Sequence, residues 1–242
     1  MSVKFSNWLF AIIIGVITAI AVLTTSCQKP NDNSTQVVSD YDGNVYHTVT
    51  VGNQEWMVEN LKVTHFNDGR EIPLVADQNI WNDLPNIKSP GYCLYNNNEA
   101  NKSIYGCLYN WYSIDNPLLV PSGWRVANNY DWQTLIDYLG GLDVAGGKMK
   151  DIGITYWKSP NDGATNESGL TVLPAGYRGH DNFAGLGEST SMASADLYND
   201  STVLAISAYS YQVRSNYGGG GLEVGLSVRC VKNVPLMNDG AR

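Results

Sequence analysis

Residues 128–141 read NNYDWQTLIDYLGG, and this stretch predicts an amphipathic helix. Its apolar residues follow the i, i+3, i+4, i+7 spacing that places side chains on one face of a helix, and they are Trp132, Leu135, Ile136 and Leu139. Asn128 or Asn129 can cap the start, and Asp131 suits the first turn. The glycine pair that closes the stretch ends the helix.

A second helix is predicted upstream of this one. Residues 104–111 repeat the same apolar spacing, with Ile104, Cys107, Leu108 and Trp111 on one stripe. We therefore expect two helices in the first two thirds of the chain.

Strands are predicted on both sides of the two helices. Residues 45–51 (VYHTVTV) alternate from one face to the other, which is typical of a strand, and residues 54–61 predict the next one. The remaining candidates are residues 170–173, 203–206, 209–213 and 225–231. In the last of these, Leu226, Val228 and Cys230 share a face. The pattern predicts an α+β domain with small antiparallel sheets and long loops.

Composition excludes one class of partner. The chain has 242 residues, a net charge of −8 and only 16% charged residues. A protein that binds nucleic acid without sequence preference needs a basic surface to displace counterions, so we expect no nucleic acid partner. The chain has 7 Trp and 15 Tyr against 4 Phe. These amphipathic rings can stack on sugars or partner proteins, or they can hold long loops in place.

The N-terminus resembles a bacterial lipoprotein signal. Lys4 precedes an apolar run over residues 8–23, and the small residues before Cys27 resemble a lipobox, with Thr24 where leucine is usual. We expect a signal peptide over 1–26 and lipid on Cys27, which would anchor the chain to a membrane; an uncleaved signal anchor is the alternative. Polar residues over 27–40 predict a flexible tether, followed by a domain over 41–233 and a tail over 234–242.

The exported part carries a series of motifs in order. They are DGNVY (42–46), VGNQEWM (51–57), ENLK (59–62), YGCLYNWY (105–112), PSGWRV (121–126), YLGG (138–141), AGGKMK (145–150), NESG (166–169), LPAGYR (173–178) and SVRCV (227–231). This series resembles the Fibrobacter succinogenes major paralogous domain, common in lipoproteins of Bacteroidetes-type bacteria. The resemblance implies a C-type-lectin-like fold and an envelope location at the outer membrane. Whether the domain faces the periplasm or the cell surface is not determined by the sequence. Two departures stand out: Val120 replaces a frequent cysteine, and residues 189–194 replace an aromatic-rich run.

Three cysteines fall within the domain: Cys93, Cys107 and Cys230. Export permits disulfides, and three cysteines allow three pairings with one thiol left over. Lectin-like folds often join the helix that holds Cys107 to the last strand, so the resemblance implies a Cys107–Cys230 disulfide. The alternative is three buried reduced thiols.

No strong catalytic or metal motif is present. The three histidines lie far apart, zinc-type spacing is absent, and no cofactor is expected. The best polar cluster is Tyr177, Arg178, His180 and Asp181, which we take as a candidate ligand site. Arg178 falls within a family motif and could equally clamp a loop.

Three functions remain open. The first is a non-catalytic envelope module that binds glycan or protein through exposed Tyr/Trp-rich loops. The second is a structural or adhesive envelope component without a small ligand. The third is an enzyme related to formylglycine-generating proteins, which would need reactive thiols near one late pocket, where the sequence offers only Cys230.

Overall fold

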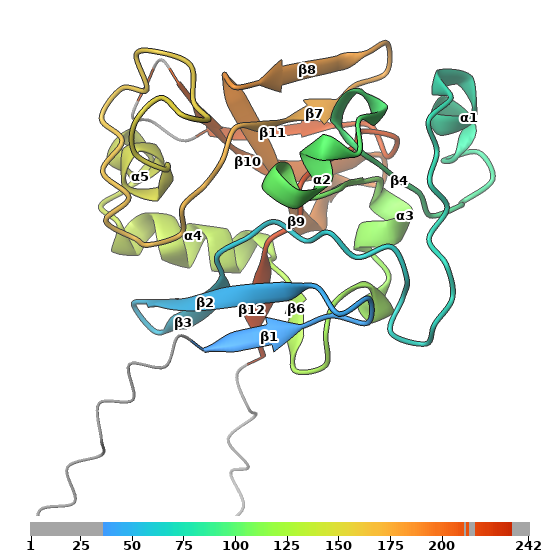
Figure 1. The fold of residues 1–242 in the computed structure, drawn as a ribbon, viewed down its shortest axis with the longest axis horizontal. Helices are drawn as coiled ribbons and strands as arrows, with labels where there is room; N and C mark the ends of the chain where they lie inside the picture. Colours follow the sequence, from blue (N-terminus) through green and yellow to red (C-terminus); the bar gives the residue numbers. More distant parts are fainter. Residues whose placement is uncertain (1–35, 211, 213–215, 234–242) are drawn as a thin grey trace, which may run out of the picture. The chain divides into compact units, whose positions relative to one another are not determined.

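The last strand of the described residues lies inside the first sheet, between two strands from earlier in the chain (Figure 1). The computed structural model describes residues 36–210, 212 and 216–233. The first sheet has five antiparallel strands in the order β1-β2-β3-β12-β6, which are β1 (Val37–Ser39), β2 (Val45–Val51), β3 (Gln54–Met57), β12 (Cys230–Lys232) and β6 (Trp124–Val126). Strand β12 therefore joins the N-terminal hairpin to the middle of the chain.

A second sheet is built from the later half of the chain. Its order is β11-β10-β9-β7-β8, with β7 (Ala175–Arg178), β8 (Phe183–Leu186), β9 (Ser189–Asn199), β10 (Thr202–Tyr209) and β11 (Asn216–Gly220). Only the β7–β9 pair is parallel, and the long β9–β10 hairpin carries register shifts near Val203 and Ala205. A third, two-stranded sheet pairs β4 (Tyr92–Cys93) with β5 (Leu108–Tyr109). The fold is mixed α/β, with antiparallel sheets predominating.

The helices of the described residues are short. They are α1 (Gln78–Asp83), α2 (Ala100–Tyr105), α3 (Trp111–Ile114), α4 (Asn129–Tyr138) and α5 (Leu142–Met149), with 3₁₀ turns η1 (Tyr95–Asn97) and η2 (Pro117–Leu119). Helix α4 confirms the helix predicted within residues 128–141. Asn128 caps it, and Asn128 and Asp131 form a reciprocal capping box. Helix α5 was not predicted, because glycines at 146 and 147 lower its helix propensity.

The helix predicted over residues 104–111 is wrong. Helix α2 ends at Tyr105, Leu108 lies in β5, and α3 begins only at Trp111. Gly106 separates them with φ of 78°, and a Cβ there would lie 2.7 Å from the Leu61 carbonyl oxygen. This close approach requires glycine and breaks the helix, although the apolar spacing continues through it.

The strand predictions are confirmed in part. Strand β2 matches residues 45–51, while β3 stops at Met57 instead of reaching residue 61. Residues 203–206 lie in β10, which ends at Tyr209, and most of 211–215 lies outside the described part. Residues 170–173 contribute only an isolated bridge at Val172, and within 225–231 the named strand begins at Cys230.

Tryptophans form the core of the domain. The six in the described part are at most 8% exposed, and they are Trp56, Trp81, Trp111, Trp124, Trp132 and Trp157. Tyrosines behave differently: Tyr41, Tyr130, Tyr138 and Tyr198 are each more than half exposed. The expectation of exposed Tyr/Trp-rich loops is therefore wrong for the tryptophans of the described residues, whereas these four tyrosines are exposed as expected. Leu226, Val228 and Cys230 share one core cluster, as predicted.

The three cysteines of the domain are free and buried. Cys107 and Cys230 belong to the same core cluster, yet the Cys107–Cys230 disulfide is not formed in the structure. Burial raises the pKa of each thiol, including that of Cys93, to about 12. The structure thus corresponds to the alternative of three buried reduced thiols.

Alkylation tests this thiol state directly. With a pKa near 12, only about one thiol in ten thousand is ionised at pH 8, and the side chains are covered. We expect iodoacetamide to leave Cys93, Cys107 and Cys230 unlabelled in the folded chain. In denaturant without reductant, mass mapping should find all three labelled, whereas labelling of only one would show that a disulfide exists.

The predicted signal peptide (1–26), Cys27 and tail (234–242) lie outside the described residues. Strand β1 falls within 27–40, the stretch expected to be a tether, and pairs with β2. No helix of the described part is both long and apolar enough to cross a membrane.

Candidate functional site

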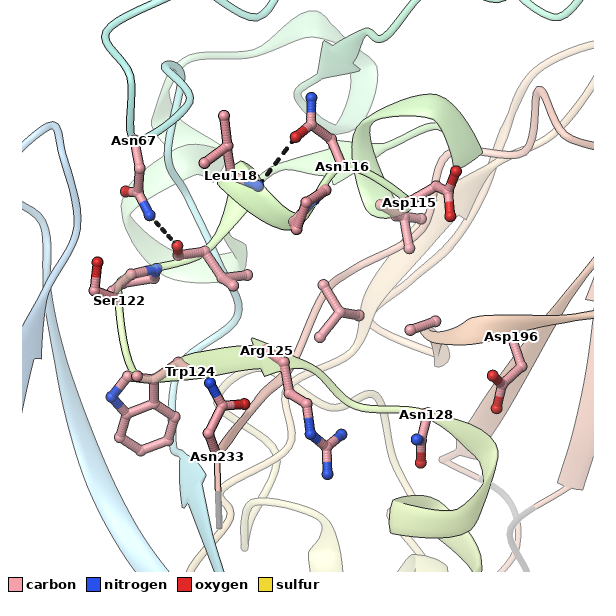
Figure 2. Close-up of a pocket in the computed structure, with 17 residues that line it drawn as sticks. Asn67, Asp115, Asn116, Leu118, Ser122, Trp124, Arg125, Asn128, Asp196 and Asn233 are labelled. Atoms are coloured by element: carbon pink, nitrogen blue, oxygen red, sulfur yellow. Dashed lines mark hydrogen bonds between the residues drawn. The ribbon is translucent and has the colours of Figure 1, made fainter. Parts of the chain in front are cut away.

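A cavity of about 780 Å³ opens beside the free edge of β6 (Figure 2). That volume is within the range of small-ligand pockets, roughly 300–1,000 Å³. Five parts of the chain line it, and the residues are Asn67, residues 114–118, residues 120–126 with Asn128, Ala195 with Asp196, and Asn233. The cavity therefore depends on the tertiary fold and not on one loop. We call it the β6 cavity.

Asparagine side chains hold the wall opposite β6. Asn116 Oδ1 accepts the Leu118 N–H at 3.0 Å and so begins η2. Asn67 donates its side-chain amide to the Val120 carbonyl, and its own N–H bonds the Leu118 carbonyl at 2.8 Å. These contacts tie residues distant in sequence and keep the wall at a fixed place.

Arg125 is neutralised by a neighbouring carboxylate. Its guanidinium makes a two-pronged contact with Asp131, with Nη2 2.7 Å from Oδ1. Hydrogen bonding to Asp131 raises the pKa of Arg125 above its ordinary value. Asp131 also accepts the Asn128 N–H at 2.8 Å, so one carboxylate caps α4 and orients Arg125.

Two further carboxylates lie on the cavity wall. Asp196 Oδ2 accepts the Asn129 N–H at 2.7 Å, while no described residue pairs with the Asp115 carboxylate. Figure 2 shows both on the side of the cavity away from Ser122 and Trp124. Because Arg125 is already paired, the cavity carries a net negative charge.

A smaller cavity of about 310 Å³ lies on the other side of Arg125 and shares Arg125 and Asn233 with the first. Gln54 lines it and donates to the backbone and side chain of Asp131, both at 3.3 Å. Its buried Oε1 has no partner in the described residues. Exposed Tyr130 also lines this second cavity.

Arg178, the centre of the predicted ligand cluster, is fully buried. Its Nη1 and Nη2 donate to the carbonyls of Val75 and Ala76 at 2.6 and 3.0 Å. The guanidinium stacks 4.4 Å from the Trp81 ring and 5.0 Å from the Phe183 ring. Arg178 therefore holds the segment before α1 in place, in agreement with the interpretation that it clamps a loop.

The other three residues of that cluster differ in their exposure. Tyr177 is half-buried against the main core, while His180 and Asp181 are in an exposed loop. The His180 carbonyl accepts side-chain amides from Gln78 and Asn82, each at 2.8 Å, which anchors this loop to α1. None of the four predicted residues lines the β6 cavity.

The histidines of the described part each face a different carboxylate. His47 lies 2.6 Å from Glu59, His65 lies 2.6 Å from Asp42, and His180 lies 3.9 Å from Glu223. Among the described residues, no group of three or more His, Cys, Asp or Glu side chains is placed to hold a metal ion.

Sequence reasoning missed the β6 cavity because its walls come from distant segments. Two signals in the sequence pointed there. Trp124-Arg125-Val126 lies in a family motif, and Val120, which replaces a frequent cysteine of the family, lines the cavity.

Comparison with known proteins gives one match. The family model described as the Fibrobacter succinogenes major domain matches residues 49–232. This range includes the whole second five-stranded sheet, strands β3, β12 and β6 of the first sheet, and the residues of the β6 cavity except Asn233. No curated protein and no solved structure matches the chain. The chain belongs to the Fibrobacter succinogenes major domain family.

Proposed function

We propose that this chain is a non-catalytic, lipid-anchored envelope module that binds a glycan or protein ligand in the β6 cavity. The observation that carries the proposal is a preformed cavity of about 780 Å³ lined by amides, carboxylates and backbone and held by hydrogen bonds between distant segments. Membership of the family favours a non-catalytic envelope module. The C-type-lectin-like fold stays a prediction.

The residues of the cavity favour binding over catalysis. Its lining side chains include neither cysteine nor histidine. Cys230, the thiol that an enzyme of the formylglycine-generating type would need, is buried in the core with a pKa raised to about 12 by burial. A thiol in that state is a poor nucleophile and a poor metal ligand.

Binding is tested with the full chain, purified in mild detergent, against a glycan array and by crosslinking to envelope proteins. We expect saturable binding that Ser122→Trp weakens, because Ser122 is exposed at the cavity wall and the larger ring would fill the space. Ser201→Trp, at the exposed β9–β10 turn, is the matched control. Binding unaffected by Ser122→Trp would refute the site, and absence of any ligand would favour a structural or adhesive role.

Anchoring is tested by metabolic labelling with palmitate. Cys27→Ala should abolish labelling, because a diacylated cysteine carries the lipid in the proposed anchor. Cys93→Ala, which removes a thiol of the domain, should leave labelling intact. Unchanged labelling of Cys27→Ala would contradict the proposed anchor.

A further inference from the structure

We infer that the β6 cavity binds an extended peptide segment carrying a basic side chain, by adding the peptide as a strand to the free edge of β6. The inference rests on the proposed binding function and names its ligand class. Its occupant would be an extended lysine- or arginine-containing segment of another envelope protein.

The register of β6 leaves its outward edge at Trp124 and Val126 without a strand partner, while β9 reaches the end of this edge, where the Ala195 N–H bonds the Ala127 carbonyl at 2.9 Å. The Ala127 N–H bonds the Arg229 carbonyl at 3.0 Å, and the Asn233 N–H bonds the Gly123 carbonyl at 2.8 Å. Between these bonds Arg125 faces Val231. In an antiparallel pair alternate residues direct their backbone groups to the same side, so Val126 and Trp124 direct theirs away from β12.

Three outward backbone groups on this edge have no partner among the described residues. Trp124 N–H closes a turn onto the Pro121 carbonyl, but no described residue bonds the Val126 N–H, the Val126 carbonyl or the Trp124 carbonyl. Val126 is only 6% exposed and lines the cavity. Buried backbone groups are nearly always paired, so an incoming strand that supplies these bonds gains stability.

Charge and aromatic placement favour a peptide over a glycan. The unpaired Asp115 carboxylate and Asp196 lie across the cavity from Trp124, where they can pair with a cationic side chain. Trp124 is the aromatic residue of the lining, and it is only 8% exposed, so it offers little ring face on which a sugar can stack.

The test uses a five-residue peptide, Thr-Val-Lys-Val-Thr with blocked ends, titrated into the ¹⁵N-labelled full chain in detergent. We expect the amide signal of Val126 to shift with saturation. A peptide of the same sequence with alternate backbone nitrogens methylated should bind about tenfold more weakly, because it lacks the donors that strand pairing needs. Replacing lysine with glutamate should weaken binding similarly.

Two variants test whether the negative charge at the cavity, and not the overall charge of the protein, contributes to peptide binding. Asp115→Asn should weaken binding of the lysine peptide about fivefold, because it removes an exposed carboxylate without a partner in the described residues. Asp200→Asn makes the same charge change at the β9–β10 turn and should leave affinity unchanged.

Other outcomes overturn the inference in recognisable ways. Equal binding of the methylated peptide would exclude strand addition. Glycans that shift Val126 where peptides do not would refute the inference and preserve the proposed function, whereas no ligand at the cavity would refute both. Peptide binding seen only after removal of residues 234–242 would identify the chain's own tail as the occupant.

Discussion

Arg229→Met should lower the free energy of unfolding by about 3–5 kcal/mol, because it removes a fully buried cation from a network that joins three parts of the chain. Arg229 Nε donates to Asn60 Oδ1 at 2.7 Å, and Nη1 donates to the carbonyls of Met57 and Leu170 at 3.1 and 3.0 Å. Burial lowers the pKa of Arg229 to about 10, so the guanidinium keeps its charge at pH 7. Methionine of similar length cannot donate to these oxygens.

Denaturant and thermal unfolding measure this loss, which corresponds to a fall in Tm of about 10 °C for a domain of this size. Arg70→Met is the matched control, since the Arg70 side chain is 62% exposed and pairs with Asp68 at the surface. It should change stability by about 0.5 kcal/mol or less. Equal effects of the two substitutions would show that the buried network contributes nothing of its own.

Arg178→Lys should also destabilise the domain, by about 2–3 kcal/mol, although it preserves the charge. The planar guanidinium reaches the Val75 and Ala76 carbonyls with two nitrogens while it lies between two aromatic rings. A lysine ammonium is a single point charge and cannot make both contacts in that geometry. The substitution therefore tests how much the shape of the side chain, apart from its charge, contributes to stability.

The same variant tests the role first expected for Arg178. If Arg178 only holds a loop in place, Arg178→Lys should lower stability and leave ligand affinity unchanged, because Arg178 does not line the β6 cavity. Affinity is compared at 15 °C, where the variant stays folded. Calorimetric unfolding and ligand titration on one sample give both quantities, with Arg70→Lys as the surface control. Unchanged stability combined with lost binding would show instead that Arg178 takes part in ligand binding.

Local signals in the sequence predicted some elements well. Helix α4 has its apolar face, its capping residues and its terminal glycines within one stretch, so no distant contact was needed to define it. Strand β2 carries an alternating pattern of the same local kind. Strand β9 was not predicted because its serines, threonines and alanines give little hydrophobic alternation, and its pairing with β10 defines it.

The failures arise where tertiary contacts decide the local structure. The stripe from Ile104 to Trp111 predicted a helix, but Gly106 must pass close to the Leu61 carbonyl, and no periodicity reveals that neighbour. The β6 cavity is harder still, because Asn67, Asp196 and Asn233 meet only after both sheets have formed. Arg178 could be recognised as a candidate clamp from its motif, but its partners could not.

The position of β12 has a consequence for biogenesis. Its three residues, Cys230–Lys232, lie between β3 and β6, so the first sheet stays open until every other described strand has been synthesised. Arg229, which holds the core, directly precedes β12 and is likewise synthesised after the other described strands. For a chain exported as proposed here, this order keeps the nascent polypeptide loose enough to be threaded through a translocation channel. The first sheet is then completed only on the far side of the membrane, when β12 arrives.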